Sequence, residues 1–435
     1  MVLYTPGRTT TYPDEPVDGG IRAFFLGGGD EVGNVGCILE DATGTRLLID
    51  YGLAPTKPPK YPAECPPVDD VIITHAHIDH IGMAPWVASH QGARLHGSPL
   101  TASVSGVMWR DTYKVSKIEG YPLAWDRRDM DEALHSWVTH RMGEWFDIGA
   151  WRCRFHRAGH IPGAVMVEIE TPEAKILWTG DMDTRDSPSV LGAKPVECDI
   201  LFLEGTYGNR IHPKRMGEER KLVDRVLEIV DRGGTALIPA FASGRGQDIL
   251  QILRREAPNL EVHYHGMGTR VTKHWMDHPE AVRDPKGLAK TWRWCRRVSS
   301  KSDRRKALEA DAIVTTSGML DGGPAIWYAN RLRHSGNNAI LLTGYQAEDS
   351  GGRLLLDERK LRIYGDIVPI DIEVEQLSLS NHGGQKELVD FARACNPKHT
   401  VIFHADEESR EALNILLGEE MMVHLPPNQT EILLG

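Results

Sequence analysis

Three histidines and an aspartate lie within the run His75-Ala76-His77-Ile78-Asp79-His80, directly after an apolar β pattern at Val71–Thr74. No folding requirement calls for such a cluster at the end of a strand. A turn that sends alternate side chains to opposite sides would direct His75 and His77 to one metal ion and leave Asp79 and His80 for a neighbour. Because imidazole and carboxylate suit zinc or manganese, the run predicts a metal site.

The bulk composition indicates a folded, soluble chain. Hydrophobic residues make up 41% and charged residues 26% of the 435 residues. That length favours two domains, or one domain with a large insertion. No apolar run reaches the roughly 18 residues that span a bilayer, so we expect no membrane contact. Length leaves the oligomeric state open, with a homodimer as one outcome.

The cysteines argue for a reducing compartment. They are scattered and form no Cys-x-x-Cys pair, so neither a zinc knuckle nor a redox centre is predicted. We therefore expect free thiols and a cytoplasmic location. The six positions are Cys37, Cys65, Cys153, Cys198, Cys295 and Cys395.

The net charge of −11 argues against a protein that coats nucleic acid indiscriminately, because such binding requires many neutralised phosphates. It leaves room for a local basic groove. Residues 286–306 hold nine Lys or Arg against one acid, Asp303, with Trp292 and Trp294 interleaved. A solvated basic helix face explains this stretch equally well.

Polar residues recur where apolar strands stop. Ile176–Trp178 runs into Asp181, and Ile200–Leu203 runs into Glu204. Open α/β sheets place their chemistry at such strand ends. From about Thr206 the pattern changes to strands alternating with helices, which predicts a second, doubly wound α/β unit.

Near Asp371 the first pattern returns, with a strand before Ser378, a helix over Gln385–Ala394 and a strand ending at His404. We therefore predict an insertion that interrupts one domain. The predicted segments are a leader at 1–20, the first part of the main domain at 21–205, the insertion at 206–370 and the last part at 371–435.

His160 and Asp181 are the best candidates for further ligands. His160 lies among small residues in Ala158–Ala164, which let the backbone approach a crowded site, and Asp181 has two oxygens that can bridge two cations. Alone, each is as well explained as a turn former. Together with the cluster after Thr74 they complete a set on strand ends, as a metal centre at one sheet edge requires.

These segments resemble the ordered motifs of the metallo-β-lactamase superfamily, with Asp50 matching its early strand-end aspartate. The insertion narrows the resemblance to the β-CASP nucleases, which include ribonuclease J, the pre-mRNA 3′-end cleavage subunit and archaeal relatives. The motifs that carry it are Leu203–Gly208, Pro239–Arg245, Thr316–Leu320, Gly344–Glu348, Ser380–His382 and Ile402–His404. The resemblance implies an α/β fold, an αββα sandwich with an inserted doubly wound β-CASP domain.

The same resemblance implies two divalent metal ions, zinc or alternatively manganese. The first would be held by His75, His77, His160 and Asp181. The second would be held by Asp79, His80, Asp181 and His404. Glu204 would orient His382, and His382 would be the general acid for the leaving oxygen.

The activity that the resemblance implies is hydrolysis of RNA phosphodiester bonds by a hydroxide activated by two metals, leaving 5′-phosphate and 3′-hydroxyl ends. Internal and 5′–3′ exonucleolytic cleavage both remain open, and single-stranded RNA is the favoured substrate. The chain departs from the family after two site residues, with Gly383-Gly384 after His382 and Ala405-Asp406-Glu407 after His404. The first departure puts the support of the general acid in doubt.

Two loops are candidate phosphate sites. Ser243-Gly244-Arg245 lies between a strand and a helix, so its amides and the helix N-terminus favour an anion, and Arg245 adds charge. Ser317-Gly318 closes another strand in the same way. Ordinary glycine turns are the alternative explanation.

Two other functions compete. A small-molecule metallohydrolase, such as a thioesterase or lactonase, would share His75 to Asp181 but would not need so large an insertion. A non-catalytic RNA-binding subunit would be expected to have lost ligands, whereas every ligand position is filled here.

Overall fold

The computed structural model describes residues 11–56, 58–347 and 349–435, so half of the predicted leader, residues 1–10, lies outside the described residues. It divides the chain into two compact units. The first comprises the described residues up to Asp186, with Leu191–Ile211 and His382–Gly435. The second comprises Ser187–Val190 and His212–Asn381.

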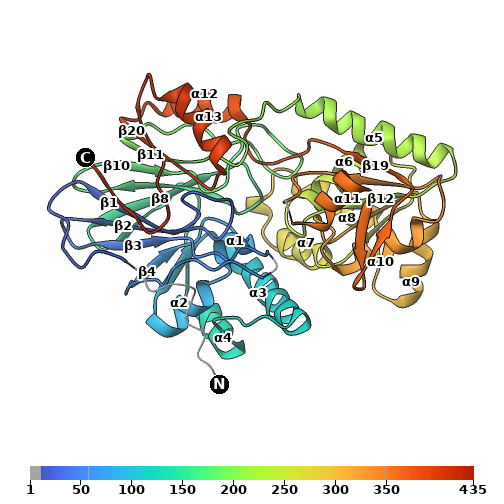
Figure 1. Cartoon of the computed structure of the whole chain (residues 1–435), viewed down its shortest axis with the longest axis horizontal. Helices are drawn as coiled ribbons and strands as arrows, with labels where there is room; N and C mark the ends of the chain where they lie inside the picture. Colours follow the sequence, from blue (N-terminus) through green and yellow to red (C-terminus); the bar gives the residue numbers. More distant parts are fainter. Residues whose placement is uncertain (1–10, 57, 348) are drawn as a thin grey trace. The chain divides into compact units, whose positions relative to one another are not determined.

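The first unit is built on two seven-stranded sheets (Figure 1). The first sheet, in spatial order, contains β22 (Glu431–Leu434), β1 (Ile21–Gly27), β2 (Gly36–Asp41), β3 (Arg46–Ile49), β4 (Asp70–Ile72), β5 (Arg94–Gly97) and β6 (Trp137–Thr139). The second contains β21 (Met422–His424), β20 (His399–Phe403), β11 (Ile200–Glu204), β10 (Lys175–Trp178), β9 (Val165–Glu170), β8 (Trp151–Arg157) and β7 (Trp145–Ile148).

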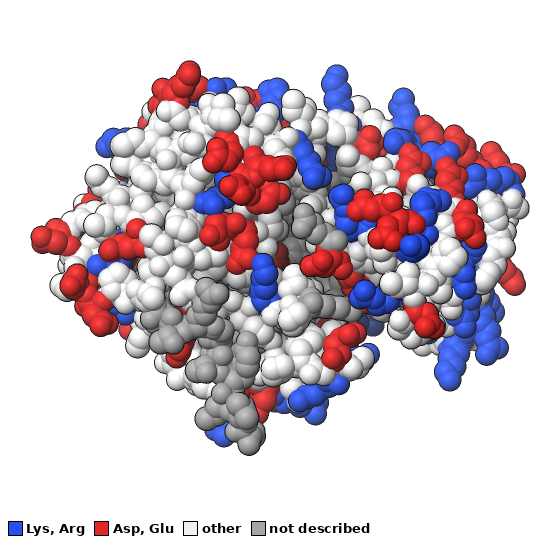
Figure 2. Space-filling model, viewed as in Figure 1, with Lys and Arg blue, Asp and Glu red and all other residues white. Residues whose placement is uncertain are grey.

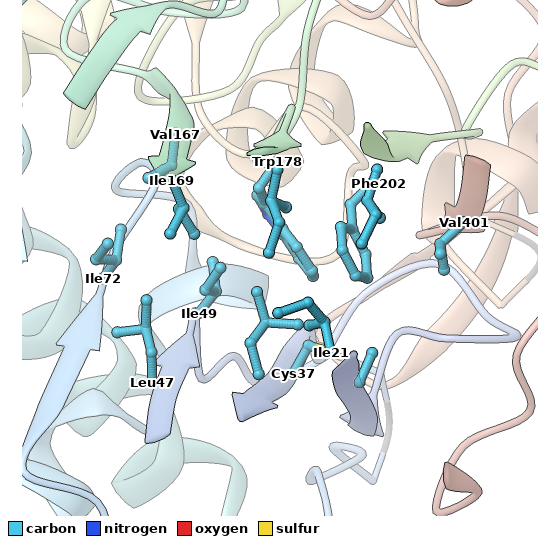
Figure 3. Packing of buried hydrophobic residues seen from close by; sticks show 14 of the residues in the cluster. Ile21, Cys37, Leu47, Ile49, Ile72, Val167, Ile169, Trp178, Phe202 and Val401 are labelled. Carbon is cyan, nitrogen blue, oxygen red and sulfur yellow. The ribbon is translucent and has the colours of Figure 1, made fainter. Parts of the chain in front are cut away.

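Strand periodicity explains why both faces of the second sheet are apolar. In β10 the side chain of Trp178 enters the core between the two sheets, whereas Leu177 packs on the opposite face. In β11 Phe202 and Leu203 divide in the same way. Successive side chains of a strand point to opposite faces, so a continuous apolar run marks a sheet that is covered twice. Figure 3 shows Trp178 and Phe202 meeting the side chains of the first sheet, among them Ile21.

Helices cover the outer face of each sheet and complete an αββα arrangement (Figure 1). Those on the side of the first sheet are α1 (Ile78–Ile81), α2 (Ala84–Gln91), α3 (Pro99–Glu119) and α4 (Arg127–His135). Those on the side of the second are α12 (Gln385–Cys395) and α13 (Glu407–Leu417). Leu388 and Leu413 of the latter pair pack against Leu203, so the buried faces of these helices match the outer face of β11.

The second unit contains a six-stranded sheet in which every described strand pair is parallel. Its spatial order is β14 (Arg296–Arg297), β13 (Val262–His265), β15 (Ala312–Thr315), β12 (Ala236–Pro239), β16 (Ala339–Leu342) and β19 (Glu373–Gln376). A separate hairpin contains β17 (Lys360–Ile363) and β18 (Asp366–Pro369). The helices are α5 (Arg215–Asp231), α6 (Arg245–Glu256), α7 (Gly268–Asp277), α8 (Pro285–Trp294), α9 (Lys301–Lys306), α10 (Gly323–Leu332), α11 (Gly351–Glu358) and the short η1 (Pro279–Ala281) and η2 (Ala307–Glu309).

One strand belongs to a different unit from the one that we predict from the sequence. The strand before Ser378 is β19, expected in the last part of the main domain, but it pairs in parallel with β16. The second unit therefore runs to Asn381, beyond the predicted boundary at residue 370. The physical reason is that a short strand carries no signal for its partner, and Leu377 packs into the core of the second unit.

Parallel strands bring their carboxyl ends to one edge of a sheet. In the second unit this edge carries the loops after β12, β15 and β16, which include Arg245, Ser317 and Thr343. All six cysteines are buried free thiols. Among the described residues, we find no helix with the length and apolar character needed to cross a bilayer.

Candidate metal centre

The predicted histidine cluster lies where β4 ends and α1 begins. Close backbone packing holds this turn against the first sheet: the amide of Val35 donates to the carbonyl of Asp79 at 2.8 Å, and that of Tyr51 donates to the carbonyl of His80 at 2.8 Å. Gly52 is required at this contact, because a Cβ there would lie 1.6 Å from the Asp79 carbonyl oxygen. The turn is therefore fixed before any side chain is considered.

Three imidazoles converge on one side of the turn. The Nδ1 atom of His77 lies 3.1 Å from Nε2 of His75 and 3.0 Å from Nε2 of His160. Oδ2 of Asp181 lies 3.4 Å from the same His75 nitrogen and 3.7 Å from that of His160. These four residues, separated widely in sequence, thus present their ligand atoms to one small volume.

A second group forms on the other side of the turn from Asp79, His80 and His404. Nε2 of His404 lies 3.5 Å from Oδ2 of Asp79. Nε2 of His80 and Nδ1 of His404 lie 3.3 and 3.2 Å from Oδ1 of Asp181. Asp181 therefore turns one oxygen to each group, the arrangement expected of a carboxylate that bridges two cations.

The donor set fits divalent cations. Nε2 of His80, Oδ1 of Asp181 and Nε2 of His404 are buried and have no hydrogen-bond partner within the described residues. Burying polar atoms without a partner is costly, and structures rarely do so. Imidazole nitrogens and carboxylate oxygens are ligands for zinc and manganese, so a bound cation would satisfy these atoms.

The charges within the centre shift its pKa values in opposite directions. Although burial lowers the pKa of His404, the carboxylates of Asp181 and Asp79 raise it to about 10. Although burial raises the pKa of Asp79, the neighbouring imidazoles of His404 and His80 hold it below its usual range. Burial and the His80 charge lower the pKa of His75. Metal ions would replace protons here, since these side chains bind metal in deprotonated form.

His382 lies beside the first group and is held at three points. Its Nδ1 lies 2.9 Å from Oε1 of Glu204, a fully buried carboxylate, and its Nε2 lies 3.9 Å from Oδ2 of Asp181. A guanidinium nitrogen of Arg185 donates to the His382 carbonyl at 3.1 Å, and the amide of Gly383 donates to the carbonyl of Met182 at 2.7 Å. These two hydrogen bonds hold the backbone at His382 and Gly383, the position of the first family departure.

Two residues near the centre gain roles that we do not assign from the sequence. Asp50 accepts from Nδ1 of His80 at 2.7 Å and from the amide of Thr74 at 2.8 Å, so it fixes the orientation of the His80 ring. Arg185 is held by Asp183 at 2.7 Å while it contacts the His382 backbone. Only the family motif points to Asp50. The only sequence feature that could have identified Arg185 is its position in the loop after Asp181.

Two site residues adopt backbone conformations that are uncommon outside glycine. Asp50 has φ of 55° and His404 has φ of 52°. Such left-handed conformations persist where surrounding structure enforces them, and they concentrate at functional sites. For His404 the enforcing contact is a hydrogen bond of 2.6 Å from its amide to the carbonyl of Gly28. In the segment after His404, Asp406 caps α13 by accepting from the amide of Ser409.

The candidate phosphate loops lie together in the second unit. Arg245 begins α6 and donates a hydrogen bond to the carbonyl of Thr343 after β16. A Cβ on Gly318 would lie 2.9 Å from the amide nitrogen of Phe241, so the Ser317-Gly318 loop touches the segment before Ser243. Gly244 has φ of 103°, which explains the glycine at this turn. Backbone amides, a hydroxyl and a guanidinium thus gather at one sheet edge.

Comparison with known families matches nearly the whole chain. Residues 28–240 match the metallo-β-lactamase superfamily, residues 247–355 the β-CASP domain, and residues 367–426 the Zn-dependent metallo-hydrolase RNA specificity domain. The predicted fold, a metallo-β-lactamase domain with an inserted β-CASP domain, is confirmed.

Several curated proteins are similar over most of their length. A probable RNase, MJ4, of Methanocaldococcus jannaschii is 33% identical over 89% of this chain and 94% of that protein. RNase aCSPSF2 of Saccharolobus solfataricus is 29% identical over 94% of this chain and 85% of that protein. Cleavage and polyadenylation specificity factor 73 of Drosophila melanogaster is 27% identical over 94% of this chain and 63% of that protein.

Among solved structures, a protein of unknown function from Enterococcus faecalis V583 aligns with a TM-score of 0.58 at 13% identity. It covers 95% of this chain and all of that structure, which shows the shared fold alone. Fold, ordered motifs and curated relatives agree: the chain belongs to the β-CASP group of the metallo-β-lactamase superfamily.

Proposed function

We propose that this chain is a metal-dependent ribonuclease that hydrolyses phosphodiester bonds of single-stranded RNA. One observation carries the proposal: His382, held by Glu204, faces the same Asp181 carboxylate that joins the two ligand groups. A proton donor thus lies beside the candidate metal centre. Relatives named as ribonucleases, and the match to an RNA specificity domain, support RNA as the substrate.

The ligand assignment belongs to the same proposal. His75, His77, His160 and Asp181 would hold one divalent cation, and Asp79, His80, Asp181 and His404 a second. We propose zinc, with manganese as the alternative, because both accept mixed imidazole and carboxylate ligands. When bound, such cations lower the pKa of water towards neutrality and offset charge on the phosphoryl oxygens.

The protein side chains handle the leaving group. Water attacks phosphorus, the bond from phosphorus to the 3′ oxygen breaks, and that oxygen requires a proton. His382 supplies it from Nε2, the nitrogen on the side of Asp181, while Nδ1–H donates to Glu204 and fixes the tautomer. Although burial lowers the pKa of His382, Glu204 and Asp181 raise it above its usual value, which favours the protonated ring. The products carry 5′-phosphate and 3′-hydroxyl ends.

A cytoplasmic location is part of the proposal, supported by the six cysteines, which are all free thiols. We also propose that the loops with Ser243, Gly244, Arg245, Ser317 and Gly318 contact RNA phosphates. Support comes from the amides, hydroxyl and guanidinium at one sheet edge, where α6 begins. Thioesterase and lactonase activity are the competing outcomes.

A time course on end-labelled RNA tests the proposal. Zinc-loaded and manganese-loaded protein is incubated with 5′-monophosphorylated, 5′-triphosphorylated and circular RNA, and with thioester and lactone panels. We expect cleavage of RNA and none of the small substrates. Cleavage of the circle identifies internal cutting, whereas dependence on a 5′-monophosphate identifies a 5′–3′ exonuclease. Light scattering on the same preparation separates a monomer from a homodimer.

Hydrolysis of thioesters or lactones without RNA cleavage, under both metals, would contradict the assignment. His382→Ala serves as the internal check, because a contaminating nuclease would cleave equally well in that preparation. The matched control is His399→Ala, which removes another imidazole of the same unit. Within the described residues, the His399 ring contacts His424 and lies in neither ligand group.

A further inference from the structure

The basic stretch at residues 286–306 folds as α8, β14 and α9, and its strongest charge lies on α9. Lys301, Arg305 and Lys306 are exposed, and the single acid, Asp303, is occupied in capping the helix through Ser299 and Ser300. Figure 2 shows Lys and Arg side chains gathered where Figure 1 places α9. In the part of the chain that the structure describes, none of these three cations pairs with a carboxylate.

Several other cations of the second unit are paired with carboxylates. Arg225 pairs with Glu373, and Arg215 pairs with Glu219 and Asp248. The chain as a whole carries a net charge of −11, so acidic partners are plentiful elsewhere. Cations left without partners in an acidic protein repel each other, which a bound anion would relieve.

Aromatic side chains adjoin these cations. The guanidinium carbons of Arg304 and Arg331 lie 3.9 and 3.7 Å from the centre of the Trp327 ring. Tyr364, at the turn between β17 and β18, leaves 70% of its surface exposed. Burial lowers the pKa of Arg304, and the charges that Tyr328 and Tyr364 can carry oppose that shift. The Nε of Arg304 is buried without a hydrogen-bond partner among the described residues.

One core cluster ties these elements together. Ala307 of η2, Tyr328 of α10 and Leu361 of β17 pack in the same group of buried residues. On the surface, the guanidinium groups of Arg304 and Arg331 meet over the ring of Trp327, and Tyr364 follows β17 directly in the chain. We call this surface the cationic face and define it by Lys301, Arg304, Arg305, Lys306, Trp327, Arg331 and Tyr364.

We propose that the cationic face is a second contact site for single-stranded RNA, built into the β-CASP unit. The proposal rests on the proposed ribonuclease function. Surfaces that bind single strands combine cations that follow the phosphates with aromatic rings that stack on bases. Here the exposed ring of Tyr364 would stack on a base, and the unpaired cations of α9 would contact the phosphates. A duplex, whose bases are already stacked, would gain only the charge contacts.

RNA binding by variants in an Asp79→Ala background tests the site, because cleavage does not then interfere. Fluorescence anisotropy with a labelled 30-nucleotide single strand follows the Kd. We expect the triple variant Lys301→Gln, Arg305→Gln, Lys306→Gln to raise Kd about tenfold and to reduce the slope of log Kd against log salt by about 2. Tyr364→Ala is expected to raise Kd about fivefold with an unchanged salt slope.

The matched control removes three exposed cations that already have carboxylate partners. Lys221, Arg353 and Arg393 pair with Glu375, Asp357 and Glu420 at 2.8, 2.7 and 2.5 Å. Replacing all three by Gln changes the net charge equally, and we expect less than a twofold rise in Kd. Circular dichroism and melting temperature check that each variant folds.

The outcomes separate this inference from the nuclease assignment. Equal weakening by both triple variants would reduce the effect to net charge and overturn the site. Equal affinity for duplex RNA, or binding to vesicles with anionic lipid in place of RNA, would also overturn it. The protein could fail to cleave RNA with either metal and still bind RNA in a way that depends on Tyr364. That result would contradict the nuclease assignment and support the cationic face as an RNA-binding site.

Discussion

The candidate metal centre of the first unit and the cationic face of the second arrange their charged groups in opposite ways. At the centre, imidazoles and carboxylates are buried against each other, and several of their polar atoms have no partner among the described residues. On the cationic face, Lys301, Arg305 and Lys306 are exposed and form no ion pair among the described residues, and the guanidinium groups of Arg304 and Arg331 lie over Trp327. A small cation needs fixed, dry ligands, whereas a flexible polyanion needs exposed charge that many strand positions can use.

Asp79→Ala tests the centre most severely. It removes a ligand from the second group, and we expect cleavage to fall below detection while the fold persists. The measurements are the rate on end-labelled RNA and the melting temperature of the metal-free protein, which should match that of the metal-free wild type. Asp69→Ala, an exposed aspartate just before β4, is the control with full activity. An active Asp79→Ala would remove this residue from the mechanism.

His382→Ala separates proton donation from metal binding. General acid catalysis contributes roughly 10²–10⁴-fold, so we expect kcat to fall by that factor while metal content is unchanged. Elemental analysis and single-turnover cleavage measure the two quantities. A parallel loss of metal would instead make His382 a ligand, which its distance of 3.9 Å from Asp181 leaves as the competing assignment.

Asp50→Asn tests the residue that orients His80. Partners behind metal ligands contribute roughly 10–100-fold to metal affinity, so we expect affinity to fall within that range. Competition with a chelating dye measures it. Asp70→Asn is the matched control, because Asp70 contacts His96 at 2.8 Å in the same unit, and neither residue is a proposed ligand. Equal losses in both variants would point to a general effect on folding.

Arg245→Ala gives the smallest effect and tests the second unit. A charge-assisted hydrogen bond to phosphate contributes about 1.5–3 kcal/mol, so KM for RNA should rise about tenfold or more. We expect kcat and metal content to stay near wild type, in contrast to the three changes above. Arg254→Ala, near the other end of α6, controls for charge. If the melting temperature falls and KM does not change, Arg245 is structural, through its bond to Thr343.

Most of the strands and helices could be predicted from the sequence. The strands before Asp181 and Glu204 are short apolar runs, and β10 and β11 occupy them. The helix predicted over Gln385–Ala394 is α12. These features are local, because strand periodicity and helix capping depend on neighbours in sequence. The unit to which β19 belongs could not be predicted from the sequence, because it depends on the pairing of β19 with β16.

For the candidate site, the sequence supplied residue types and the structure supplied their directions. That His75, Asp79 and His404 form a metal site remains a proposal, although their ligand atoms lie in the two groups described. The sequence suggests that Asp181 is shared by both ligand sets, and the structure shows which of its oxygens lies near each group. No pattern joins Arg185 to the backbone of His382, because residues so far apart meet only when the sheet edges pack.

The sequence by itself determined which side chains can bind cations, that they follow apolar strands, and that a second α/β unit interrupts the first domain. Only the tertiary structure decided which nitrogens and oxygens face one another, and that the guanidinium groups of Arg304 and Arg331 lie over the ring of Trp327. The reason is physical: side-chain chemistry and periodicity belong to single segments. Convergence of ligands and the sharing of a surface arise when segments distant in the chain exclude water together.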